Sequence, residues 1–166
     1  VPSPEGVLTP ELWKLDVGDS VTIRPRAKGV FTFNSAFRHQ LLVSTVTGIV
    51  PYVSFLREYF REDLIGHQFY VLQGASYHDE FVYDKELTRL ANQHPDTICY
   101  LPTVSRSTEE RNKGWTGITG RVNLVVEGYV EEFELSAENT LIYACGHPGM
   151  IEDIKTRMIP KGFQIC

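Results

Sequence analysis

The sequence TLIYACGHPGM, residues 140–150, decides the fold of this chain. A short apolar run ends in Cys145 and Gly146, and Pro148 follows as a residue that favours the first turn of a helix. The pattern predicts a strand, a tight turn and a helix that runs towards Lys161, with a thiol at the end of the strand. In open α/β sheets ligands bind at this carboxyl edge. A small buried cysteine before an ordinary glycine turn would show the same local pattern.

The same alternation of apolar runs and amphipathic segments continues through residues 37–166. The predicted strands cover residues 40–46, 68–73, 97–104 and 140–144, with a fifth that begins at residue 163. The predicted helices cover residues 52–60, a segment capped by Asp79, a segment after Gly120, and residues 148–158. Repeated β-α units of this length predict an α/β fold, a doubly wound parallel five-stranded sheet.

Residues 1–36 show a different pattern. Thr9 and Pro10 are typical of an N-cap and a first helical position, residues 20–24 alternate as a half-buried strand, and residues 28–33 could pair with them. Two strands and one short helix do not make a stable unit alone. We therefore expect this segment to be the end of a β-barrel whose other strands are absent, and the chain to be a piece of a longer protein.

Composition excludes several classes of protein. The net charge of -5 argues against a general binder of nucleic acid or anionic membranes. No apolar run approaches the roughly 20 residues that a membrane span needs. The 3 cysteines lie far apart without a CxxC pair, so no zinc or iron–sulfur site is indicated, and an odd number fits a reducing cytoplasm.

A second turn at the same predicted edge covers residues 45–51. Gly48 and a helix that begins at Pro51 could present backbone N–H groups to a pyrophosphate. A plain βα turn with proline at its first helical position would look the same, because the segment holds one glycine.

A third turn follows the strand at residues 97–104 and contains Ser105 and Arg106, with Arg121 nearby. Hydroxyl and guanidinium groups together bind a phosphate dianion through charge-assisted hydrogen bonds. The alternative is a solvated loop in which neighbouring glutamates balance the arginines.

Cys145 could also act as a nucleophile, but that chemistry needs a base within reach. His147 is close in sequence. A residue two places on, entering a helix, rarely points back at the thiol, so a Cys-His pair is the weaker interpretation.

Taken together, these segments resemble the ferredoxin–NADP reductase family. Residues 145–150 are similar to the family's Cys-Gly-x-Pro-x-Met segment beside the nicotinamide, and residues 47–51 to the end of its Gly-Thr-Gly-Thr-Gly-Ile-Ala-Pro pyrophosphate loop. Residues 77–83 are similar to the segment after its second strand. Residues 105–106 and 120–122 match positions where members hold the 2′-phosphate of NADP.

The N-terminal stretch fits the same resemblance. Residues 6–9 and 15–19 are similar to the end of the family's flavin-binding barrel, which implies that Gly6 and Thr9 lie near the FAD pyrophosphate. The family's Arg-x-Tyr-Ser flavin motif and its C-terminal aromatic tail do not occur in residues 1–166. Ser44 and Val46 stand where the family's nucleotide loop usually has glycines.

The resemblance implies the NADP(H)-binding part of a flavin-dependent oxidoreductase that transfers electrons between NADPH and ferredoxin or flavodoxin via FAD. Residues 1–36 would be the remnant of the FAD-binding barrel and residues 37–166 the NADP-binding domain. Cys145 would line the hydride-transfer site. The implied cofactor-binding residues are Thr47, Gly48, Pro51, Ser105, Arg106, Arg121, Gly146, Pro148, Met150, and, for FAD, Gly6 and Thr9. The alternatives are an NADH-dependent reductase that feeds an oxygenase and a non-catalytic nucleotide-binding fragment.

Overall fold

The computed structural model describes residues 6–26, 29 and 31–166. The chain divides into two compact units, Val1–Val30 and Phe31–Cys166. In the described part of the first unit, one helix, α1 (Leu8–Leu12), begins after Val7. Thr9 therefore lies inside the helix, and its prediction as N-cap was wrong, because Pro10 is tolerated throughout a first turn and does not fix the start.

The predicted strand at residues 20–24 is also wrong. These residues are exposed and pair with no other described residue as a strand. Alternation alone makes a strand only where a neighbouring strand satisfies its backbone groups. The predicted partner, residues 28–33, includes residues 28 and 30, which lie outside the described residues, and residues 31–33 are not a strand.

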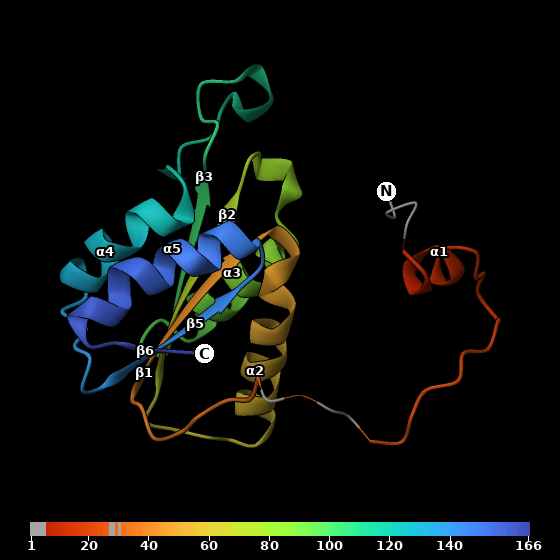
Figure 1. Ribbon diagram of the computed structural model, residues 1–166, viewed down its shortest axis with the longest axis horizontal. Coiled ribbons are helices and arrows are strands. Elements are labelled where there is room, and N and C mark those ends of the chain that lie inside the picture. Colours follow the sequence, from red (N-terminus) through yellow and green to blue (C-terminus); the bar gives the residue numbers. More distant parts are fainter. Residues whose placement is uncertain (1–5, 27–28, 30) are drawn as a thin grey trace. The chain divides into compact units, whose positions relative to one another are not determined.

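In the second unit, the described residues form one parallel sheet in the order β4-β3-β2-β1-β5-β6 (Figure 1). The strands are β1 (His39–Thr45), β2 (Gln68–Ala75), β3 (Ile98–Val104), β4 (Ile118–Thr119), β5 (Thr140–Cys145) and β6 (Gln164–Ile165). The predicted α/β class is confirmed, but this sheet has six strands rather than the predicted five. The additional strand, β4, has two residues within a polar loop, so no apolar run marks it.

Helices cover both faces of this sheet, as the doubly wound prediction requires. In Figure 1, α4 (Val122–Glu132) and α5 (Pro148–Met158) lie on one side, and α2 (Val50–Arg61) and α3 (Asp84–Gln93) on the other. Short 3-10 helices complete the connections, namely η1 (Val46–Ile49), η2 (His78–Glu80), η3 (Glu110–Asn112) and η4 (Ile159–Lys161). Strand β1 contributes side chains to the apolar core on both faces of the sheet. Leu41 and Val43 pack with α4 and α5, while Leu42 packs with α2 and α3.

Strands β2, β3 and β4 are added on one side of β1, and the later strands β5 and β6 on the other, so the order of strand addition reverses at β1. Such a reversal opens a crevice at the carboxyl ends of the strands, where α/β proteins bind ligands.

The prediction that Asp79 caps a helix was wrong. Asp79 lies in η2 and pairs with Arg111 at 2.9 Å, while α3 begins after Tyr83, which has a left-handed φ of 62°.

The second unit begins at Phe31, six residues before the expected domain boundary. Phe31 and Phe33 pack on the α2 side of the sheet. The Asn34 backbone N–H donates to the Tyr143 hydroxyl at 2.8 Å, and that hydroxyl donates to the Thr32 carbonyl at 3.2 Å.

In the described chain, no helix combines the length and the apolar character of a membrane span.

Candidate functional site

A cavity of about 500 Å³ lies at the carboxyl edge of the sheet. Its walls come from the ends of β1 and β2, from the turn after β3, and from the first turns of α4 and α5. The lining residues are Thr45, Val46, Gly74, Ala75, Ser76, Ser105, Arg106, Arg121, Val122, Asn123, His147, Gly149 and Met150. The three turns predicted to share this edge therefore do meet around one hollow.

The turn after β1 packs directly on the turn after β5. Gly48 is buried, and a Cβ there would lie far inside van der Waals contact with the Cys145 carbonyl and 2.9 Å from Gly146 Cα. Glycine at this position therefore permits close approach of two backbone segments. The buried Gln73 side chain holds the turn in place, because its Nε2 donates to the Val46 carbonyl at 3.1 Å.

The turn after β5 is held by polar contacts to β1 and to its own helix. Gly146 has a φ of 133°, and the His147 backbone N–H donates to Thr45 Oγ1 at 2.8 Å. His147 Nδ1 accepts from the Gly149 backbone N–H at 3.1 Å, which caps α5. The His147 ring nitrogen that faces the backbone is thus engaged by its own helix.

Cys145 lies beside the cavity and outside its lining. Its side chain packs with the apolar cluster on the α2 and α3 side of the sheet. Burial raises the pKa of the Cys145 thiol, so the thiol is protonated at neutral pH. A protonated thiol whose neighbour His147 is hydrogen-bonded elsewhere is poorly suited to nucleophilic attack.

Asn112 joins the loops after β2 and β3 into one wall. Its side chain is buried, with Nδ2 donating to the carbonyls of Ser76 and Arg106 at 2.9 Å each. Its Oδ1 accepts from the His78 backbone N–H at 2.9 Å. This role could not be predicted from residue type, because an asparagine within a polar loop normally indicates an exposed turn.

The arginines near the cavity differ in their partners. Arg121 is exposed at the N-terminus of α4, and across residues 6–26, 29 and 31–166 its side chain has no hydrogen bond or ion pair. Arg106 Nη1 donates to the Tyr77 hydroxyl at 3.1 Å and lies 3.4 Å from a Glu109 oxygen. Arg111 lies outside the lining and pairs with Asp79, whose pKa it lowers through a hydrogen bond.

The predicted site residues fall into three groups. Ser105, Arg106, Arg121 and Met150 line the cavity. Thr47 and Gly48 lie in η1 and Pro51 in the first turn of α2, all outside the lining. Also outside it, Cys145 ends β5, Gly146 follows, and Pro148 begins α5. Gly6 and Thr9 belong to the first unit. The predictions missed several lining residues, chiefly those at strand ends, where short side chains carry no chemical signature: Thr45, Gly74, Ala75, Ser76, Asn123, His147 and Gly149.

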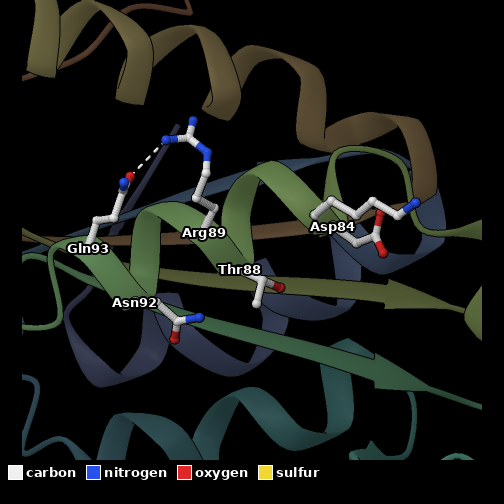
Figure 2. A pocket seen from close by; sticks show the side chains of 6 residues that line it. Asp84, Thr88, Arg89, Asn92 and Gln93 are labelled. Carbon is white, nitrogen blue, oxygen red and sulfur yellow. Dashed lines mark hydrogen bonds between the residues drawn. The ribbon is translucent and has the colours of Figure 1, made fainter.

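A second depression lies along the outer surface of α3 (Figure 2). Its lining comes from this helix alone, and Arg89 Nη1 donates to Gln93 Oε1 at 2.7 Å across it. A surface built from one face of one helix lacks the convergent groups of a cofactor site. The cavity at the strand ends is therefore the stronger candidate.

Comparison with known proteins agrees with this architecture. Residues 42–156 match the family model described as "Oxidoreductase NAD-binding domain". The chain belongs to the oxidoreductase NAD-binding domain family. Its relatives include ferredoxin–NADP reductases, so the resemblance to that family is confirmed.

Three of the relatives of this NAD-binding domain illustrate the range. It is 30% identical to the root isozyme 2 of chloroplastic ferredoxin–NADP reductase from Arabidopsis thaliana, over 93% of this chain and 41% of that protein. It is 27% identical to NADH-cytochrome b5 reductase 1 of Candida glabrata, over 96% of this chain and 54% of that protein. The CS-b5R domains of human Ncb5or in the NAD+ form superimpose with a TM-score of 0.73 at 20% identity, covering 99% of this chain and 46% of that one.

Proposed function

We propose that this chain binds NADP(H) in the cavity at the carboxyl edge of the sheet. The observation that carries the proposal is the pair of arginines, Arg106 and Arg121, that line this cavity together with Ser105. In a chain of net charge -5, this concentration of positive charge suits a phosphate group. The 2′-phosphate would bind here.

The rest of the dinucleotide would extend along the strand ends towards the turn after β5. The first turns of α4 and α5 border the cavity, and helix N-termini favour negative charge, as a pyrophosphate carries. Thr47 and Gly48 lie in the adjoining turn. The nicotinamide would lie near Gly146, Pro148 and Met150, with Cys145 shaping the pocket as a neutral thiol rather than as a nucleophile.

We further propose that the intact protein is a flavin-dependent oxidoreductase that passes electrons between NADPH and ferredoxin or flavodoxin. FAD would supply the redox chemistry between a two-electron donor and a one-electron acceptor. Residues 1–36 would be the end of the FAD-binding barrel, with Gly6 and Thr9 near its pyrophosphate. The free thiols of Cys99, Cys145 and Cys166 fit a reducing compartment such as the cytoplasm.

A second candidate is an NADH-dependent reductase on the same fold, including one that feeds an oxygenase. Arg106 already contacts Glu109 and Tyr77, which leaves less positive charge for a 2′-phosphate, and one relative is an NADH-cytochrome b5 reductase. A non-catalytic nucleotide-binding role for the chain by itself is the third. NADPH and NADH turnover by the full-length protein separates the three, since the third gives neither.

Arg106→Ala is expected to weaken NADP+ binding about tenfold, close to 1.5 kcal/mol, the lower end of the value of a charge-assisted hydrogen bond. NAD+ binding should stay within about twofold, because the lost contact is to the 2′-phosphate. Isothermal titration of the purified chain with each nucleotide measures both. Arg89→Ala is the matched control, since that guanidinium donates to Gln93 on α3 and does not line the cavity. Equal losses for the two nucleotides would sink the 2′-phosphate assignment.

A further inference from the structure

We propose that Glu109 sets the preference between phosphorylated and unphosphorylated dinucleotides by competing with the ligand's phosphate for Arg106. The inference rests on the proposed nucleotide function and deepens it, because it concerns the selectivity of the same cavity. Glu109 would act as a specificity-determining residue without contacting the reacting atoms.

A three-residue cluster carries this inference. The Tyr77 hydroxyl donates to Glu109 Oε2 at 2.5 Å and accepts from Arg106 Nη1 at 3.1 Å. Arg106 Nη1 also lies 3.4 Å from Glu109 Oε1. The side chains of Glu109 and Arg106 are about half exposed, 48% and 54% respectively, so a ligand can reach both. Among these three side chains, Arg106 lines the cavity.

Surrounding contacts hold the cluster in this arrangement. The Arg111 guanidinium lies over the Tyr77 ring, 4.2 Å from its centroid, and is itself paired with Asp79. The Glu109 backbone N–H donates to the Arg106 carbonyl at 3.1 Å, and the Glu109 carbonyl accepts from the Asn112 N–H at 2.9 Å. Tyr77 and Glu109 are thus both fixed from sides that do not involve the cavity.

A phosphate dianion that approaches Arg106 meets this carboxylate. It must share the guanidinium with Glu109 or displace it, and like charges close together are unfavourable. A dinucleotide that carries a hydroxyl in place of the phosphate avoids this repulsion. Arg121 has no such competitor among the described residues. The repulsion of the phosphate therefore arises at Arg106 and not at Arg121.

Glu109→Gln tests the competition with little structural change. The glutamine amide oxygen can still accept from the Tyr77 hydroxyl, while the negative charge is lost. We expect the dissociation constant for NADP+ to fall about two- to tenfold, because exposed ion pairs are worth little and repulsion of the ligand adds to them. The constant for NAD+ should change less than about twofold.

Glu110→Gln is the matched control. Glu110 is the next residue, is 83% exposed on its side chain and pairs with Lys113 at 2.9 Å rather than with a cavity residue. It should change the affinity for neither nucleotide. In the Arg106→Ala background, the gain in NADP+ affinity from Glu109→Gln should shrink, because Glu109 then has no Arg106 guanidinium for which to compete with the phosphate.

The outcomes separate this inference from the function on which it rests. If the parent chain binds neither NADP+ nor NAD+ in isothermal titration, both the proposed function and the role of Glu109 fail. If the parent binds them but Glu109→Gln leaves the ratio of affinities unchanged, the role of Glu109 alone is overturned. An equal gain in Glu110→Gln, or an undiminished gain without Arg106, would also overturn it.

Discussion

Gly48→Ala is expected to destabilise the α/β unit by about 2–3 kcal/mol, the upper part of the range for overpacking. An added Cβ at this position would overlap the Cys145 carbonyl and lie 2.9 Å from Gly146 Cα. All of these atoms are backbone, so relief requires the turns after β1 and β5 to move apart. Urea unfolding followed by circular dichroism measures the loss.

Gly128→Ala provides the matched control for this effect. Gly128 lies in the interior of α4 and is exposed, and an added Cβ there meets no atom within 4 Å apart from its chain neighbours and the backbone of its own helix. The same chemical change should therefore stabilise the unit by about 0.5–1 kcal/mol through helix propensity and reduced freedom of the unfolded chain. A Gly48→Ala chain as stable as the parent would contradict the close approach of the two turns.

Arg121→Ala is expected to cause the largest loss of NADP+ affinity of any single arginine replacement near the cavity, about 30- to 150-fold or roughly 2–3 kcal/mol. Arg121 lines the cavity, and no group within the described chain competes for its guanidinium. Arg106, by contrast, is shared with Glu109 and Tyr77. NAD+ affinity should fall much less, because most of the contact is with the extra phosphate.

Two replacements bracket the Arg121 result in the same titration. Arg121→Lys should give an intermediate affinity, since lysine keeps the charge but lacks the planar fork that matches phosphate. Arg89→Ala removes a cation from the outer surface of α3, which does not line the cavity, and should leave both affinities unchanged (Figure 2). A loss in Arg89→Ala as large as that in Arg121→Ala would indicate a general charge effect.

Much of the fold could be predicted because apolar periodicity and helix-start residues act locally. The helix after β5 illustrates this, since Pro148 pre-sets the first helical φ and α5 runs from Pro148 to Met158, as predicted. The two-residue β4 and the false start at Asp79 could not be predicted this way. Both depend on neighbours distant in sequence, Thr103 and Val104 for β4 and Arg111 for Asp79.

The candidate site was predictable in its turns but not in its supports. Motif positions pointed to Arg106, Arg121 and Met150, which do line the cavity. Asn112 was missed, because its importance comes from burial between two loops rather than from its residue type or spacing.

The backbone conformation of Val46 explains an observation made from the sequence. The sequence indicated a position where similar loops usually carry glycine. The structure shows why, since Val46 adopts a left-handed φ of 43°, a conformation that is strained for a β-branched residue. The backbone of this turn thus keeps a glycine-like conformation although the side chain is valine.

The most direct test of the central claim is a titration of the ¹⁵N-labelled chain with NADP+, followed by amide chemical shifts. If the cavity holds the nucleotide, the perturbed amides will cluster at its lining, including Ser76, Ser105, Arg121 and Gly149. Amides on the outer face of α3, such as Thr88 and Asn92, should stay unperturbed. Saturable shifts confined to that outer face, or no saturable shifts at all, would contradict the assignment of the cavity as the NADP(H) site.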